Sequence, residues 1–227
     1  MSVPPEKDFS AALERQDGFV APRYRSGQRS AEALLEAGRS LLARISYEGL
    51  TVSELCKEAN LTTGAFYRRF ESKDAFFQAL QRLALDDIAR MREVLFPTVD
   101  TGRAESLGRC AWRVVDAIRE WHLRHRGVVR ASIQRRDHTP GSWHPFKEDA
   151  RSSLHAIAKH MAQQPELRER QDGEQRLSVA LQMVMGTMIN AALNDPGPLR
   201  LDDEAMTGAL AHVVTLYAQA STDFVQG

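Results

Sequence analysis

Residues 49–73 constrain the fold of this chain more than any other stretch, because they carry the start and stop signals of consecutive helices. Thr51 is a favourable N-cap residue, and Glu54 three positions later completes the spacing of a capping box. Asn60 follows this first short helix, and asparagine tolerates the left-handed backbone conformation that ends helices. We therefore expect a short helix, a tight turn and a second short helix, the arrangement of a helix-turn-helix.

The second helix of the pair is expected to have one apolar side and one polar side. Thr62 or Thr63 can cap its N-terminus, and Ser72 can cap the helix that follows. Phe66 and Phe70 are four residues apart, so they face the same side and can enter a core. The polar side remains available for the major groove of DNA, where the second helix of such a pair docks.

Residues 59–73, ANLTTGAFYRRFESK, resemble the signature of the tetracycline-repressor (TetR) family of transcriptional regulators. Five residues stand where that signature expects them: Gly64, Tyr67, Phe70, Ser72 and Lys73. The chain departs from the pattern at Asn60, where the family usually has glycine, and at Ala65 and Phe66, which replace a polar residue followed by Leu or Ile. The resemblance is specific over residues 24–73 and only architectural beyond them.

The resemblance implies a homodimer that binds a palindromic operator in double-stranded DNA and represses transcription until a small-molecule effector respaces its two heads. The expected DNA-binding residues are Thr51, Thr62, Thr63, Ala65, Tyr67, Arg68, Arg69, Lys73, Arg23 and Arg25. Cations suit phosphates, whereas threonine hydroxyls and the alanine methyl suit base edges. Arg23 and Arg25 either form a basic arm that reaches the minor groove or belong to a solvated tail.

Helical periodicity without β-type alternation continues along the chain, which predicts an all-α protein of about nine helices. We divide the chain into a flexible N-terminal extension (1–23), a DNA-binding domain (24–73) with a connecting helix to about residue 95, and an effector-binding and dimerisation domain (96–227). Pro97 is expected to end the connecting helix, and Gly127 to interrupt a later one.

Two roles are expected in the second domain. Bulky, adaptable side chains predict an effector pocket lined by Trp112, Trp121, Met161 and Met185. The last two helices carry apolar residues on more than one side, so we expect a dimer interface that includes Leu181, Met185, Val213 and Tyr217. Burial in the core of a monomer is the alternative for both sets. The many arginines between residues 103 and 136 either form a solvated face or bind an anionic effector.

Other classes of protein receive less support from the sequence. With 227 residues, 43% of them hydrophobic, and a net charge of zero, the chain is expected to be globular and cytoplasmic, with no apolar run near the ~18 residues of a membrane span. We find no phosphate-binding loop or hydrolase motif and expect no enzyme activity and no cofactor. His122 and His125 stand among arginines, which disfavours a metal site.

Two alternative functions stay open. The chain could be a TetR-like protein-interaction module that has lost DNA binding, because its second helix is unusual at Ala65 and Phe66. A helical-bundle enzyme is the other alternative, although the sequence offers no catalytic constellation for it.

Overall fold

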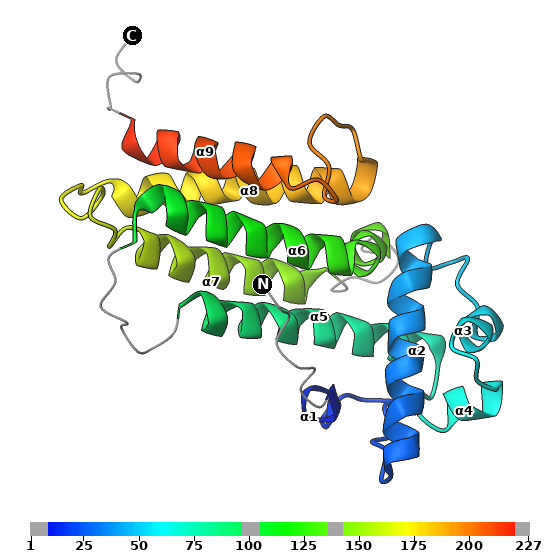
Figure 1. Ribbon diagram of the computed structural model, residues 1–227. Coiled ribbons are helices and arrows are strands. Elements are labelled where there is room, and N and C mark those ends of the chain that lie inside the picture. Colours follow the sequence, from blue (N-terminus) through cyan, green and yellow to red (C-terminus); the bar gives the residue numbers. More distant parts are fainter. Residues whose placement is uncertain (1–8, 97–104, 136–142, 221–227) are drawn as a thin grey trace. The chain divides into compact units, whose positions relative to one another are not determined.

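A computed structural model describes residues 9–96, 105–135 and 143–220. In this part of the chain the elements are α-helices, joined by turns and by one isolated antiparallel bridge between Phe19 and Phe70 (Figure 1). The labelled helices are α1 (Phe9–Leu13), α2 (Arg25–Arg44), α3 (Val52–Glu58), α4 (Thr63–Tyr67), α5 (Lys73–Leu95), α6 (Leu107–Gln134), α7 (His144–Met161), α8 (Gly173–Asn194) and α9 (Ala205–Gln219). The predicted all-α fold is confirmed, whereas Pro97 lies outside the described residues.

Contacts divide the chain into two compact units. The head unit comprises Met1–Ile88 and His125–Ser142, and the second unit comprises Ala89–Arg124 and Trp143–Gly227. Helices α5 and α6 therefore contribute residues to both units. The head unit extends beyond the 24–73 boundary expected from sequence, because it includes the C-terminal part of α6.

Three phenylalanines form the centre of the head unit. Phe66, Phe70 and Phe76 are fully buried, with ring centroids 5.0 to 5.7 Å apart. Aromatic rings at these separations attract one another in addition to the apolar area they bury. Gly38 of α2 faces this cluster, since a Cβ there would lie 2.4 Å from the Phe76 ring. The glycine thus lets α2 pack directly on the aromatic cluster beneath α4.

Helix α6 is continuous across Gly127, which differs from the interruption that we expected. A Cβ at Gly127 would lie 2.3 Å from the carbonyl carbon of Leu42, so the glycine is needed for close packing against the C-terminus of α2. Arg130 strengthens this contact by donating to the carbonyl oxygens of Leu42 (2.7 Å) and Ile45 (3.1 Å). These acceptors lie at the end of α2, where helical carbonyls lack partners within the helix.

The described part of the expected N-terminal extension packs against the rest of the head unit. Phe9 and Leu13 are buried, and the Phe19 ring lies 5.4 Å from that of Phe70. Residues 1–8 lie outside the described residues.

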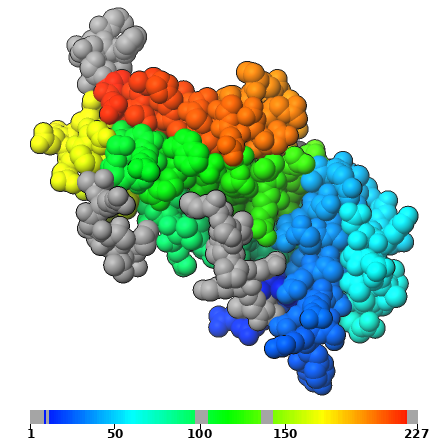
Figure 2. Space-filling view, viewed as in Figure 1, coloured from blue at the N-terminus to red at the C-terminus, as the bar shows by residue number. Residues whose placement is uncertain are grey.

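The second unit has a mainly aliphatic core. Leu177, Leu181, Val184 and Met188 repeat along one side of α8 and are buried among side chains of α6, α7 and α9. Helix α9 lies beside α8 (Figure 1). In the space-filling view, α9 forms part of the outer surface of this unit (Figure 2). By length and composition α8 could also cross a membrane, but a core helix meets the same criteria, and its buried side belongs to this core.

Candidate nucleic-acid interface

The helix-turn-helix is formed by α3 and α4, and local side chains fix the start of each helix. The Thr51 hydroxyl oxygen accepts the N–H of Glu54 (3.1 Å), while the Glu54 carboxylate accepts the N–H of Thr51 (3.2 Å). This is the predicted capping box. The Thr62 hydroxyl oxygen accepts the N–H of Ala65 (3.2 Å) and so caps α4. Two of the three threonines that we expected near DNA, Thr51 and Thr62, therefore also serve as helix caps.

The turn between the two helices has the conformation that Asn60 predicts. Asn60 has a φ of 53°, in the left-handed region that asparagine tolerates. The N–H of Leu61 then donates to the carbonyl oxygen of Cys56 (2.8 Å), which closes the turn. This geometry explains how asparagine replaces the glycine usual at this position.

Helix α4 divides into a buried and an exposed side. Phe66 is buried, and Ala65 is only 8% exposed, so its methyl group is not available for a base contact as we had expected. The exposed positions on and beside α4 are Thr62, Thr63, Gly64, Tyr67 and Arg68. Tyr67 is 59% exposed, with its ring edge-on to Phe66. The exposed side thus carries two hydroxyl-bearing threonines, a phenol and a guanidinium around a residue with no side chain.

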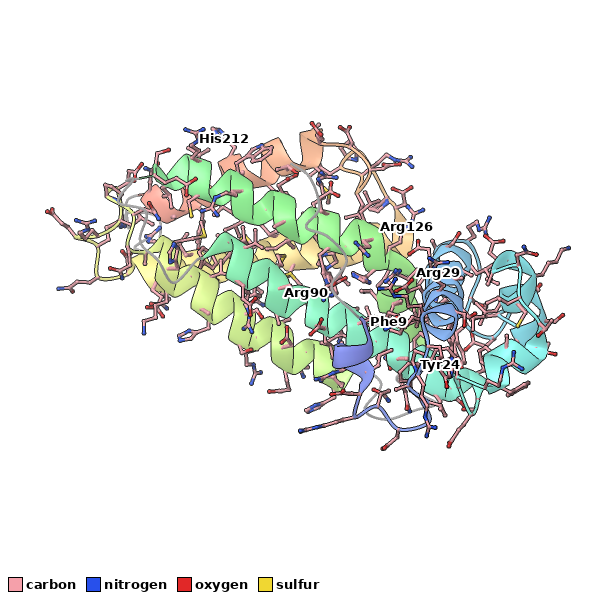
Figure 3. All side chains as sticks on the ribbon, turned by 60° about the horizontal axis from the view of Figure 1, so that its bottom comes forward. Phe9, Tyr24, Arg29, Arg90, Arg126 and His212 are labelled. Carbon is pink, nitrogen blue, oxygen red and sulfur yellow. The ribbon has the colours of Figure 1, made fainter. Side chains whose placement is uncertain are left out.

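Arg69 lies where α4 comes closest to the N-terminus of α2. A Cβ at Gly27 would lie 2.3 Å from Nη2 of Arg69 and 3.0 Å from Cβ of Pro22, so glycine leaves the space that the guanidinium fills. Arg23 and Arg25 are exposed on the same approach to α2, and Tyr24 between them is 77% exposed (Figure 3). The structure therefore places Arg69 against the first turn of α2, the helix that begins at Arg25.

Lys73 has a different role from the phosphate contact that we expected. Its ammonium group donates to the carbonyl oxygens of Tyr47 (3.1 Å) and Leu50 (2.9 Å), and lies 4.4 Å from the centre of the Tyr47 ring. Two of the three N–H groups of the side chain are thus used inside the head unit. Lys73 fixes the loop between α2 and α3.

Sequence reasoning missed a hydrogen-bond network between Tyr47, Asp74 and Arg135 in the head unit. Tyr47 donates its hydroxyl to Asp74 (2.6 Å), Arg135 donates to the same carboxylate oxygen (2.7 Å), and the Arg135 guanidinium lies 3.7 Å from the Tyr47 ring centre. The hydrogen bonds from Tyr47 and Arg135 hold the pKa of Asp74 below its usual range. Burial, followed by the bond to Asp74, raises the pKa of Tyr47 well above its usual value. Arg135 is 61 residues from its partner, so no local pattern could reveal this contact.

The expected effector residues occupy different environments in the second unit. Met161 is fully buried, and Trp121 and Met185 are partly buried. Trp121 lies 6.2 Å from Phe146 of α7, measured between ring centroids. Trp112 is 48% exposed, which does not fit the lining of an internal pocket.

Two inward arginines of α6 already have protein partners. Arg119 is buried and donates to the hydroxyl of Thr207 (2.8 Å), the carbonyl oxygen of Leu201 (2.8 Å) and the carboxylate of Asp116 (3.1 Å). Arg113 pairs with Glu105 at 2.7 Å. These cations hold the unit together, which argues against their use in binding an anionic effector.

The expected dimer residues are also separated by the structure. Leu181 is fully buried in the core of its own unit, so it cannot form part of an outer face. Val213 is 47% exposed, and Met185 and Tyr217 are partly buried. Two further apolar residues outside the predicted interface positions, Met183 of α8 and Leu216 of α9, are also exposed. His212, which Figure 3 labels on α9, is exposed beside Val213.

His122, His125 and the two cysteines take structural positions. His122 pairs through Nδ1 with the carbonyl oxygen of Ile118 (2.8 Å), and His125 pairs through Nε2 with Asp87 (2.9 Å). Cys56 and Cys110 are buried, and burial raises the pKa of the Cys110 thiol to about 11. Within residues 9–96, 105–135 and 143–220, no group of three or more His, Cys, Asp or Glu side chains could hold a metal ion.

Comparison with known proteins gives a family match and similar folds. Residues 34–80 match the family model described as bacterial regulatory proteins, tetR family. GusR of Salmonella enterica is 16% identical, with a TM-score of 0.59 over 84% of this chain and 96% of that one. The TetR family transcriptional regulator PfmR of Thermus thermophilus is 18% identical, with a TM-score of 0.57 over 80% and 96% of the two chains.

A further similar structure is the transcriptional regulator FadR of Bacillus subtilis in complex with stearoyl-CoA, which is 16% identical, with a TM-score of 0.56 over 84% of this chain and 99% of that one. No curated protein matches the sequence. At these identities the solved structures establish the fold. Residues 34–80, which include the helix-turn-helix, are thus similar to bacterial regulatory proteins of the tetR family, and the chain shares the fold of the solved TetR family regulator PfmR.

Proposed function

We propose that this protein is a sequence-specific DNA-binding regulator, a repressor that a small-molecule effector releases from its operator. The observation that carries the proposal is the exposed side of α4, which presents Thr63, Tyr67 and Arg68 from a capped helix-turn-helix. Hydroxyl and guanidinium groups are the donors that read base edges and bind phosphates. Gly64 between them lets the helix backbone approach a base pair closely.

The proposed binding mode places α4 in the major groove. Arg68 and Arg69 would bind phosphates or base edges, with the Tyr67 hydroxyl on a neighbouring phosphate. Arg23 and Arg25 would extend the contact from the N-terminus of α2. Such a protein acts where the chromosome is, which for a bacterial regulator is the cytoplasm.

We infer that the active form is a homodimer. Met183, Val213 and Leu216 form an apolar face on α8 and α9, with Met185 and Tyr217 partly exposed. The proposed interface includes Met183 and leaves out Leu181, because Leu181 is buried within its own subunit. Two copies joined at this face would present two recognition helices to a palindromic operator, whose half-sites lie about 34 Å apart.

For the effector, we propose a site between α6, α7 and α8, near Trp121, Met161 and Met185. The pairing of Arg113 and Arg119 within the protein favours a ligand recognised mainly through apolar and aromatic contacts. FadR of Bacillus subtilis, which has a similar fold, was solved with stearoyl-CoA, a molecule with a long apolar chain. The effector would release DNA by binding more tightly to a state with a different spacing of the heads.

The main alternative is a protein-interaction module that has lost DNA binding. Its basis was the unusual pair Ala65 and Phe66. Both side chains are buried, so they belong to the core of the head unit and remove nothing from the exposed side of α4. DNA binding is therefore the better supported function.

The test is selection of bound duplexes from a random-sequence DNA pool by the full-length wild-type protein. We expect enrichment of a palindromic sequence, and for Arg68→Ala about tenfold weaker binding to it. If Arg68 contacts a phosphate, the slope of log K against log salt concentration falls by about 0.9. Arg82→Ala, an exposed arginine of α5, is the matched control and should bind as wild type does. Failure to enrich any sequence would contradict the proposal.

A further inference from the structure

Residues 9–20, which we call the N-terminal clasp, precede the residues that match the family model and pack on the head unit. Phe9, labelled in Figure 3, and Leu13 are buried. The Phe9 ring contacts Phe19 edge-on (6.4 Å between centroids), and Phe19 contacts Phe70 (5.4 Å). The clasp thus continues the aromatic cluster beneath α4 rather than extending into solvent.

Two backbone hydrogen bonds join the clasp to the chain directly after α4. The N–H of Val20 donates to the carbonyl oxygen of Arg69 (2.8 Å), and the N–H of Glu71 donates to the carbonyl oxygen of Gly18 (3.0 Å). These bonds flank Phe70 on both sides and form the antiparallel bridge with Phe19. They satisfy backbone groups at the end of a helix that would otherwise lack partners.

The clasp is also fitted closely to the start of α5. Gly18 has a φ of 72°, and a Cβ there would lie 2.6 Å from Cβ of Ala75. Gln16 donates its side-chain N–H to the side-chain oxygen of Gln78 (3.4 Å). Glycine is therefore required at position 18, both for its backbone conformation and for the close approach to α5.

Helix α4 depends on such external contacts for its orientation. It has five residues, far fewer than a helix needs to be stable alone. The cap at Thr62 fixes its N-terminal end, and the clasp holds the opposite end, at Arg69 and Phe70. We infer that the N-terminal clasp positions the C-terminal end of the recognition helix, and with it Arg68 and Arg69, for DNA binding. This inference rests on the proposed function.

The experiment compares full-length Phe19→Ala with Phe19→Leu, which keeps an apolar side chain. Val20→Ala is the matched control, because the Val20 side chain is 52% exposed while its N–H remains. Binding is measured on the duplex that the wild type selects, well below the unfolding midpoint, so that loss of stability alone leaves the protein folded. For Phe19→Ala we expect about tenfold weaker binding and a salt slope lower by about 0.9 for each lost phosphate contact. Phe19→Leu should recover most of the affinity, and Val20→Ala should match wild type.

Amide hydrogen exchange tests the clasp without DNA. In Phe19→Ala the amides of Val20, Glu71 and Arg69 should exchange faster, whereas those of α2 should not change. Unchanged affinity and salt slope in a folded Phe19→Ala protein would overturn the inference. If Phe19→Ala does not fold, Gly18→Ala serves in its place, because its Cβ displaces the clasp at Ala75.

The two proposals can fail separately. A wild-type protein that selects no duplex contradicts DNA binding. The role of the clasp is then tested by amide hydrogen exchange at Arg69 in Phe19→Ala. Faster exchange there in the variant supports positioning of α4, and unchanged exchange overturns it.

Discussion

Helices α3, α4 and α5 of the head unit differ from α8 and α9 of the second unit in how their ends are stabilised. In the head unit, caps come from residues close in sequence: Thr51 and Glu54 for α3, Thr62 for α4, and Ser72, whose hydroxyl accepts the N–H of Ala75 (3.0 Å), for α5. In the second unit, the residues directly before α8 and α9, Asp172 and Glu204, form no side-chain cap, although the Asp203 carboxylate accepts the N–H of Ala205 (2.8 Å). Distant arginines stabilise the other end of α9 instead.

Arg170 and Arg176 provide this stabilisation of α9. Arg170 donates to the carbonyl oxygens of Gln219 (3.1 Å) and Ala220 (3.0 Å), and Arg176 donates to that of Tyr217 (3.1 Å). Asp172 binds both guanidinium groups, and their hydrogen bonds lower its pKa to about 2. Local side chains thus cap the starts of α3, α4 and α5, whereas the C-terminus of α9, like that of α2 with Arg130, is stabilised by arginines more than forty residues away.

The difference extends to the surface. The head unit buries its aromatic cluster, whereas the second unit leaves Met183, Val213 and Leu216 about half exposed on α8 and α9. The proposed dimer would cover this face. The second unit would then depend on another chain for part of its burial, and the head unit would not.

The largest expected effect comes from a substitution that tests whether a second chain covers the exposed face of α8 and α9. In Met183→Asp a charge enters the proposed dimer face, and its desolvation should prevent association. We expect a mass near 25.5 kDa by light scattering at micromolar concentration, instead of twice that value for wild type. Binding to a palindromic duplex should fall by about a hundredfold or more, because the second half-site no longer binds intramolecularly.

Gln182→Asp is the control for this change, since the exposed neighbour Gln182 already has a polar side chain. It should remain dimeric. A dimeric Met183→Asp protein would show that the apolar face lies outside the interface.

The same contrast explains what could be predicted from the sequence. The capping box at Thr51 and the turn at Asn60 depend on residues within a few positions, and both predictions are confirmed. Lys73 was assigned to phosphate because its use inside the head depends on carbonyl groups 23 and 26 residues away. Arg135 and the clasp residue Phe19 were missed for the same reason: their partners are distant in sequence.

The sequence was less informative about which apolar residues of a helix are buried within the subunit and which are exposed. Periodicity identifies an apolar stripe, but it does not distinguish burial within one subunit from burial between two. Leu181 and Met183 are two residues apart on α8, and one is fully buried while the other is half-exposed. Trp112 was likewise expected inside and lies at the surface, because a bulky side chain has the same sequence pattern in either place.

The next largest effect tests the long-range contacts of the second unit. Arg119→Ala removes a buried guanidinium and leaves Asp116, Thr207 and the carbonyl of Leu201 without it. Breaking a buried charged network typically costs about 3 kcal/mol or more. Urea unfolding followed by tryptophan fluorescence reports this unit, since all three tryptophans belong to it.

The control for Arg119→Ala is Arg109→Ala, at an exposed position on the same helix. It should change the free energy of unfolding by less than about 0.5 kcal/mol. Equal effects of the two substitutions would mean that the Arg119 network contributes nothing beyond an ordinary surface residue.

The smallest expected effect comes from glycine-to-alanine substitutions at two positions of α6, one in each unit. Gly108 and Gly127 both lie in α6, the first in the second unit and the second in the head unit. A Cβ at Gly127 would meet the backbone of Leu42 at 2.3 Å, and backbone cannot move aside as a flexible side chain can. A Cβ at Gly108 would have its nearest neighbour, the Thr215 hydroxyl oxygen, at 3.9 Å, an ordinary contact.

We therefore expect opposite signs for the same substitution. Gly127→Ala should destabilise the head unit by about 1–3 kcal/mol, the usual cost of overpacking, despite the better helix propensity of alanine. Gly108→Ala should be neutral or stabilise the second unit by up to about 1 kcal/mol, because alanine loses less backbone entropy in a helix. Far-UV circular dichroism follows both units during urea unfolding, and tryptophan fluorescence isolates the second. If Gly127→Ala proves as harmless as Gly108→Ala, the close packing of α6 on α2 is not what holds this part of the head together.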